Sequence, residues 1–138
     1  MSWANAYVGT PYADLGRSKL GCDCWGLARL VYEQELGITL PSYLGDYVSA
    51  EERAEIDGLI GDAEHTGPWR PSPQIMPFDL LVFRRGRLRS HIGIALSARH
   101  MLHMDGEDQA RIVRLAEPRW QTRYCGAYRH VKRGVNAQ

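Results

Sequence analysis

The chain has 138 residues, 44% of them apolar and 24% charged, with a formal net charge of +1. This is the composition of an ordinary globular protein, and the length fits one domain, residues 1–138, with a core of its own. The near-neutral charge gives no argument for nucleic-acid binding, and no apolar run is long enough for membrane insertion, so we expect neither.

Helical signals dominate the first part of the chain. Residues 1–12 predict a short helix and a turn, and residues 13–22 a glycine-containing loop. From Asp23 to Leu36 the apolar residues recur at spacings of three and four, which predicts an amphipathic helix. Asp23 suits its N-cap, and Gly37 stands where a glycine ends a helix.

The second part changes from helix to strand. A more polar helix is predicted over residues 49–60, with Ser49 as its cap, and a proline-containing surface loop over residues 61–77. Short apolar or alternating runs then predict strands, the first of which ends in a turn at Arg84–Arg87. Helices followed by an antiparallel meander indicate an α+β fold, with N-terminal helices packed on the sheet. The predicted strands cover residues 78–83, 91–96, 101–104, 112–115 and 124–131.

Cys24 stands at the predicted start of the first long helix. A thiol is strongly nucleophilic only as the thiolate, and the unpaired N–H groups of a first helical turn favour negative charge. This position therefore favours a reactive cysteine. The alternative interpretation is that Cys24 opens an apolar stripe and belongs to the core.

His91 lies at the start of a strand, on the face opposite to Ile92 and Ile94. It is a candidate general base, and the alternative is a surface histidine. His103, on the following strand, reaches the same face only in certain registers, such as the pairing of Ala95 with Met101. It would then orient His91, as the third member of a catalytic triad does. The alternative for His103 is a partly buried histidine with a backbone partner.

The remaining candidates are weaker. The other three histidines, His65, His100 and His130, are predicted to be surface residues. Cys22 is predicted to be structural, and a disulfide between Cys22 and Cys125 has no support in the spacing. A zinc site with Cys22 and Cys24 is disfavoured, since a single C-x-C lacks a second paired cluster.

Taken in order, six stretches resemble one family, the NlpC-type cysteine peptidases, which are papain-like enzymes that cut peptides of the bacterial cell wall. The resemblance covers nearly the whole chain. The matching stretches are Val8–Tyr12, Asp23–Leu27, Pro77–Phe83, Ser90–Ile94, Met101–His103 and Tyr124–Arg129.

The resemblance implies a papain-like fold and specific roles. Cys24 would be the nucleophile, His91 the general base and acid, and His103 the residue that orients His91. The substrate would be the stem peptide of peptidoglycan, cut between D-glutamate and the diamino acid, without metal or cofactor. The residues that the resemblance places at the substrate are Tyr12, Asp23, Trp25 and Ser90.

Three departures from the family pattern bear on substrate preference. Trp25 replaces the usual serine after the cysteine, Phe78 replaces the usual glycine before the strand aspartate, and a tryptophan-glycine-glycine motif is missing near Tyr12. The Asp23–Leu27 form resembles the branch found in phage tails and phage-derived gene-transfer particles.

That branch implies a peptidase carried by a particle, with tail or baseplate hub proteins as partners, which opens the wall during DNA delivery. The first residues lack the pattern of a signal peptide, so we expect synthesis in the cytoplasm and incorporation into a virion or phage-like tail. Two alternatives stay open, a structural tail component without activity and a cell-wall amidase on the same scaffold.

Overall fold

A computed structural model describes residues 3–13, 16–40, 68–85, 88–106 and 108–135 of the chain. The helix predicted over residues 49–60 and the histidine at position 65 lie outside these residues. No helix in the described part is long and apolar enough to span a bilayer.

The N-terminal part contains the two predicted helical segments, but a short hairpin lies within the predicted loop over residues 13–22. A 3₁₀ helix, η1 (Trp3–Ala6), precedes a short hairpin of β1 (Arg17–Ser18) and β2 (Gly21–Cys22). Helix α1 (Cys24–Val31) then runs directly into a π-helical turn, η2 (Tyr32–Leu36). Asp23 caps α1, and Gly37 ends the helical segment with a left-handed φ of 67°, so both predicted helix ends are confirmed.

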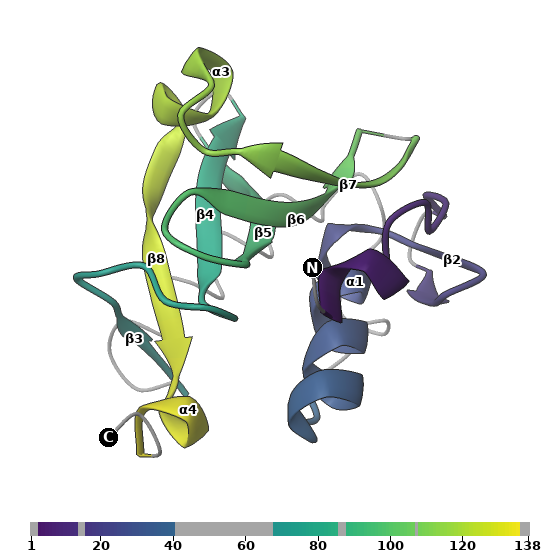
Figure 1. Ribbon diagram of the computed structural model, residues 1–138, viewed down its shortest axis with the longest axis horizontal. Coiled ribbons are helices and arrows are strands. Elements are labelled where there is room, and N and C mark those ends of the chain that lie inside the picture. Colours follow the sequence, from purple (N-terminus) through teal and green to yellow (C-terminus); the bar gives the residue numbers. More distant parts are fainter. Residues whose placement is uncertain (1–2, 14–15, 41–67, 86–87, 107, 136–138) are drawn as a thin grey trace.

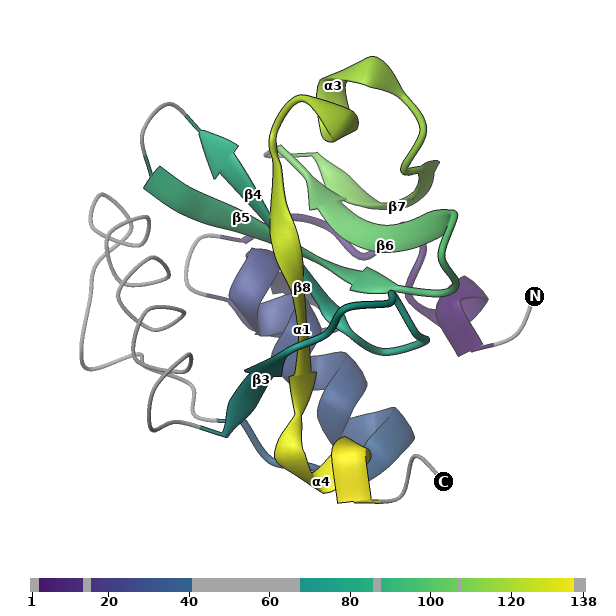
Figure 2. The same cartoon turned by 90° about the vertical axis from the view of Figure 1, so that its left-hand side faces the viewer.

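A six-stranded antiparallel sheet forms the rest of the fold, and Figure 1 shows α1 beside it. The strand order is β3-β8-β4-β5-β6-β7, so the closing strand β8 is inserted between β3 and β4. The short helices α3 (Pro118–Gln121) and α4 (Val131–Val135) lie at opposite ends of β8 (Figures 1 and 2). The strands are β3 (Trp69–Pro71), β4 (Leu80–Arg85), β5 (Leu88–Ala95), β6 (His100–Asp105), β7 (Gln109–Arg114) and β8 (Tyr124–His130).

Three further sequence predictions need correction. The region 61–77 was predicted to be a loop, but β3 lies within it as an edge strand, a position that tolerates its proline. The predicted turn at 84–87 was too wide, because β4 continues to Arg85. Helix α3 was not predicted, since four residues are too few to show a helical period.

The sheet separates two cores, because alternate residues of each strand point to opposite faces. The principal core lies between the sheet and α1 with η2, and the smaller core lies on the other face beneath α3. Full burial of each large aliphatic side chain contributes roughly 1.5–3 kcal/mol. The principal core includes Leu27, Val31, Leu80, Val82, Ile92, Ile94 and Leu102, and the smaller core consists of Leu81, Phe83, Ala95, Met101, Trp120 and Ala127.

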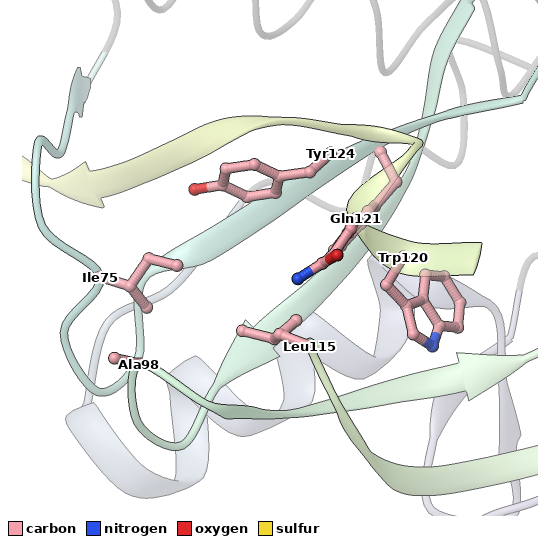
Figure 3. A pocket seen from close by; sticks show the side chains of 7 residues that line it. Ile75, Ala98, Leu115, Trp120, Gln121 and Tyr124 are labelled. Carbon is pink, nitrogen blue, oxygen red and sulfur yellow. The ribbon is translucent and has the colours of Figure 1, made fainter. Parts of the chain in front are cut away.

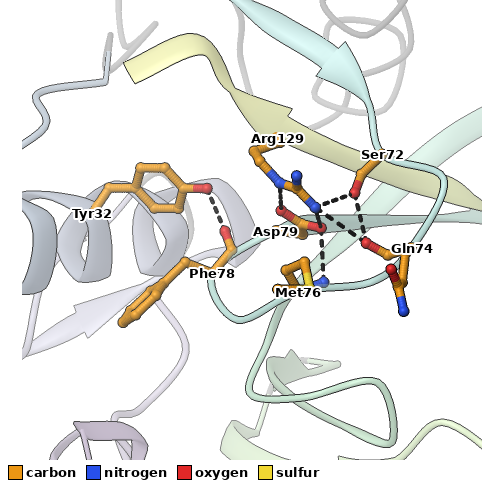
Figure 4. A network of polar contacts seen from close by, with 7 residues as sticks. All are labelled: Tyr32, Ser72, Gln74, Met76, Phe78, Asp79 and Arg129. Carbon is orange, nitrogen blue, oxygen red and sulfur yellow. Dashed lines mark hydrogen bonds and ion pairs between the residues drawn. The ribbon is translucent and has the colours of Figure 1, made fainter. Parts of the chain in front are cut away.

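A polar network fixes the entry to β4, as Figure 4 shows. The carboxylate of Asp79 is buried, and Arg129 of β8 donates to both of its oxygens at 3.1 and 3.3 Å. Just before it, Phe78 has a φ of 73°, a conformation that glycine adopts without penalty but a bulky residue does not. The ring of Phe78 stacks on Trp3 at 4.6 Å and lies under the guanidinium of Arg133 at 5.2 Å. These contacts hold Phe78 where the family pattern has glycine.

Candidate active site

The start of α1 is built by residues close in sequence. Asp23 is buried and its Oδ1 accepts a hydrogen bond of 2.7 Å from the N–H of Gly26, while Cys24, the first helical residue, is partly exposed. This cap leaves the thiol in the first turn, where the helix dipole and the backbone N–H groups stabilise negative charge. The predicted setting for a reactive thiol is therefore present.

A glycine in this turn lets another segment approach closely. A Cβ atom on Gly26 would lie 2.1 Å from the carbonyl oxygen of Gly16 and 3.0 Å from the Cβ of Cys22. The segment just before β1 therefore packs closely against the helix start, and only glycine fits. Cys22, predicted to be structural, is fully buried in this contact region.

Tyr12 is held beside the segment that leads into Cys24. It forms an isolated parallel bridge with Cys22, and its backbone N–H donates to the carbonyl of Asp108 at 3.0 Å. The flanking residues reinforce this position, since Cys22 donates to Pro11 and Ala13 donates to Cys22. The ring of Tyr12 is partly buried against the principal core.

The two predicted histidines meet across neighbouring strands. His91 Nε2 and His103 Nδ1 lie 3.0 Å apart, at hydrogen-bond distance, and both residues are buried. The strand register pairs Gly93 with His103 and Ala95 with Met101, which is one of the registers that the sequence required. The interpretation of His91 as a surface histidine is therefore wrong. With Nε2 directed at His103, Nδ1 is the ring nitrogen of His91 that can exchange a proton with a thiol.

Two breaks in the ladder flank this site. Phe83 pairs with His91 and Arg84 with Arg89, so Ser90 is the extra residue of a bulge next to His91. On the other side of β4 the register shifts between Val82 and Phe83, which leaves Cys125 as the extra residue in β8. Bulges bend a strand and redirect side chains, and they are common beside active sites. Ser90 lies in β5, but its side chain is outside the described part.

Trp120 is the site residue that sequence reasoning missed. Its indole, on α3, is 5% exposed and stacks on His91 at 5.8 Å, and it meets the ring of His103 edge to face at 4.6 Å. The ring of Phe83 joins this cluster, with its centroid 5.2 Å from that of Trp120 and 6.3 Å from that of His91. The only signal in the sequence was Pro118, a residue favoured in the first turn of a helix.

Burial bears on the other sequence predictions. Asp23 and Trp25 were placed at the substrate; they are 1% and 2% exposed, Asp23 caps α1 and Trp25 packs in the principal core, and their contact with substrate stays a prediction. His130 was predicted on the surface but is buried against Trp69, with ring centroids 4.9 Å apart. His100 is partly buried at the start of β6.

The structure also bears on metal and disulfide chemistry. Within the described residues, no three histidine, cysteine or acidic side chains are grouped so that they could hold a metal ion. All three cysteines are free thiols.

The amino-acid sequence of the chain is similar to those of known bacterial proteins. It is 27% identical over 128 residues to the murein DD-endopeptidase MepS/murein LD-carboxypeptidase of Escherichia coli K12, covering 92% of this chain and 59% of that protein. It is 28% identical over 127 residues to the gamma-DL-glutamyl hydrolase of Bacillus subtilis 168, covering 91% and 27%. The chain thus spans less than two thirds of either relative.

Solved structures share the fold. An NlpC/P60 family protein from Bacillus cereus ATCC 10987 superposes with a TM-score of 0.67 at 22% identity, over 93% of this chain and 38% of that one. The NlpC/p60 domain of the peptidoglycan hydrolase SagA superposes with a TM-score of 0.61 at 23% identity, over 91% and 92%. The model of the NlpC/P60 family matches residues 9–129, and the chain therefore belongs to the NlpC/P60 family.

Proposed function

We propose that this protein is a cysteine peptidase that hydrolyses the stem peptide of bacterial peptidoglycan, with Cys24, His91 and His103 as its catalytic residues. The observation that carries the proposal is the contact of 3.0 Å between the two buried histidines, on strands against which α1 packs. Cys24 begins that helix. A nucleophile, a base and a residue that orients the base are thus supplied by adjoining elements.

The reaction would proceed by acyl transfer. His91 takes the thiol proton of Cys24, and the thiolate attacks the carbonyl carbon of the scissile amide. The backbone N–H of Cys24 is one donor to the resulting oxyanion. The C–N bond then breaks as His91 returns its proton to the amine, which leaves a thioester. Water, deprotonated by His91, hydrolyses the thioester to a carboxylate and the free thiol.

His103 would act through His91. Its Nδ1 lies at hydrogen-bond distance from His91 Nε2, so it fixes the ring orientation and supports the imidazolium that forms during attack. Trp120 and Phe83 pack around the same rings and restrict their rotation.

The bond that we favour is the one between D-glutamate and the diamino acid. The gamma-DL-glutamyl hydrolase among the relatives supports it by name, whereas MepS is named for DD-endopeptidase and LD-carboxypeptidase activities. An amidase on the same scaffold would cut a different amide with the same residues. Mass spectrometry of muropeptide digests separates these bonds, because each releases a fragment of different mass.

The test is to incubate the purified protein with tetrapeptide and cross-linked muropeptides under reducing conditions. We expect the wild type and the Cys125→Ala variant to cut, and the Cys24→Ala variant to be inactive, since Cys24 begins α1 whereas Cys125 lies within β8. Cleavage by Cys24→Ala at the wild-type rate would remove Cys24 as nucleophile. No cleavage by the wild type would favour a structural component that keeps the fold without the activity.

We also propose that the enzyme is carried in the tail of a phage or phage-like particle and contacts tail or baseplate hub proteins. What supports this is the resemblance of Asp23–Leu27 to that branch of the family. Mass spectrometry of purified particles from a producing strain should find the protein in the tail fraction. Its recovery from the soluble cell fraction alone would contradict the proposal.

A further inference from the structure

A small apolar pocket lies on the face of the sheet that carries the smaller core, and Figure 3 shows its lining side chains. We call it the α3 pocket. Phe83 and Trp120 form part of its lining together with Ile75, Leu115 and Tyr124, and its volume is about 170 Å³. An apolar cavity of about 150 Å³ is known to hold benzene. The α3 pocket therefore has room for one large aliphatic or aromatic side chain.

The rim of the α3 pocket has the character of a contact surface. Tyr124 is 41% exposed and Ile75 is partly exposed, so apolar surface faces solvent there. Burial, together with the charge of Asp79, raises the pKa of Tyr124, which keeps its hydroxyl a neutral donor. Ligand pockets are mostly apolar, with a small number of polar groups that fix the orientation of the ligand.

A second hollow adjoins the first, and its chemistry is different. It has a volume of about 470 Å³ and shares Ala98, Leu115 and Gln121 with the α3 pocket. Its other walls include Arg99, His100 and Arg114, so we call it the basic hollow. The backbone N–H of Leu115 donates a hydrogen bond of 2.8 Å to the carbonyl of Arg99. This bond fixes the lining segments of the two hollows relative to each other.

The positive charge of the basic hollow is not compensated within the described residues. Neither Arg99 nor Arg114 forms an ion pair there, and the nearby carboxylate of Glu117 faces Arg119 at 3.6 Å. By contrast, Arg111 on the same strand as Arg114 is paired with both Asp105 and Asp108. Two uncompensated guanidinium groups attract a carboxylate and, unlike lysine, bind it with two parallel hydrogen bonds.

The geometry points to a docking site for an acidic peptide segment of a partner protein. One large apolar side chain of that segment fills the α3 pocket, and a neighbouring carboxylate binds over Arg99 and Arg114. A simple polyanion would leave the apolar pocket empty, and a purely apolar ligand would leave the two arginines without an anion. This docking goes beyond the peptidase function, since no step at Cys24 uses it, although two lining residues, Phe83 and Trp120, also pack against the histidine pair.

Binding can be measured with a synthetic probe. The probe is a fluorescein-labelled pentapeptide with one leucine between two pairs of glutamates, and fluorescence anisotropy gives its Kd. We expect replacement of the leucine by serine to weaken binding roughly tenfold, because the aliphatic side chain is no longer buried. We expect replacement of all glutamates by glutamine to weaken it by a similar factor and to abolish its salt dependence.

Variants of the protein locate the site. Arg114→Gln should weaken the probe about threefold, whereas Arg111→Gln, the same change at a paired arginine of the same strand, should have no effect. Ala98→Leu, at an exposed residue shared by both hollows, should fill the entrance and reduce the leucine-dependent part of binding. In ¹H–¹⁵N spectra the indole N–H signal of Trp120 should shift when the probe is added, and the spectra also confirm that each variant is folded.

Three results would overturn the inference. One is equal affinity for the leucine and serine probes, which would make the surface a general anion patch. Another is tighter binding of an anionic wall polymer such as a teichoic acid than of the leucine probe at the same salt concentration. The third is equal loss of binding in Arg111→Gln and Arg114→Gln, which would place the peptide elsewhere.

Discussion

The two halves of the candidate active site are specified in different ways. The start of α1 depends on residues within three positions of Cys24: Asp23 caps the helix, and Gly26 admits the neighbouring loop. The histidine pair depends on residues twelve positions apart, on two strands whose register brings Nε2 and Nδ1 to 3.0 Å. A local pattern in the sequence can reveal the first arrangement, whereas the second exists only once the sheet has formed.

This difference has consequences for mutation. A change at the helix start acts on a few backbone contacts and should affect stability and the thiol together. A change at His103 removes the partner of His91 but leaves the His91 ring stacked on Trp120, so it should affect activity more than folding. The following experiments test this contrast, beginning with the largest expected effect.

Replacement of His103 should disrupt the histidine pair and lower the activity. We expect His103→Ala to lower kcat on muropeptides on the order of a hundredfold, because His91 loses the group that orients it. His103→Asn should retain more activity than His103→Gln, since the amide of asparagine lies close to where Nδ1 stood. Equal activity of the two variants would argue against orientation through Nδ1, and a pH–rate profile of each variant would show whether the base itself is altered.

Replacement of Gly26 should disrupt the packing at the start of α1 and lower the stability. We expect Gly26→Ala to lower the free energy of unfolding by about 1–3 kcal/mol, because the new methyl group meets the carbonyl oxygen of Gly16. Gly37→Ala is the matched control: its φ of 67° costs about 1 kcal/mol, but nothing lies within 4 Å. Urea denaturation gives both values, and alkylation followed by mass spectrometry reports the reactivity of Cys24. An unchanged thiol in Gly26→Ala would mean that the loop contact does not shape the site.

The same contrast explains what the sequence could predict. The cap at Asp23, the end at Gly37 and the alternation around Ile92 and Ile94 are local signals, and the structure confirms them. The register that joins His91 and His103 was one of several that the sequence allowed, because a slip of one residue turns every side chain to the other face.

Residues fixed by tertiary contacts were harder to predict. Trp120 stands on a helix of four residues, and the ring contacts that place it at the site, with Phe83, His91 and His103, are long-range. β3 is an edge strand recognisable only beside β8. The resemblance placed Trp25 at the substrate, and that role stays a prediction, but the packing of its ring in the principal core was not predicted.

Replacement of Phe78 tests the same contrast at the start of β4. There the positive φ of one residue is a local requirement, and the strand that follows pairs with distant parts of the chain. Alanine and glycine both remove the ring contacts with Trp3 and Arg133, but only glycine accepts a φ of 73° without penalty. We therefore expect Phe78→Gly to be more stable than Phe78→Ala by about 1 kcal/mol, although in an unstrained loop glycine is the less stable of the two. Thermal or urea unfolding of the pair measures this difference, and a more stable alanine variant would show that the backbone relaxes.

The smallest effect is expected at the far end of β8, where His130 is buried. Burial lowers the pKa of His130, and its Nδ1 accepts a hydrogen bond of 3.2 Å from the N–H of Lys132, so the fold favours the neutral ring. The unfolded chain, with an ordinary pKa of about 6.5, then binds more protons below that pH, and stability must fall as the pH drops. For one histidine, the change of the unfolding free energy with pH cannot exceed about 1.4 kcal/mol per pH unit. His130→Phe keeps a ring beside Trp69 and does not titrate. The unfolding free energies of wild type and variant are measured from pH 7.5 to 5.5, and the change in their difference with pH is the contribution of His130. A constant difference would mean that His130 titrates alike in both states, and that acid weakens the sheet through other groups.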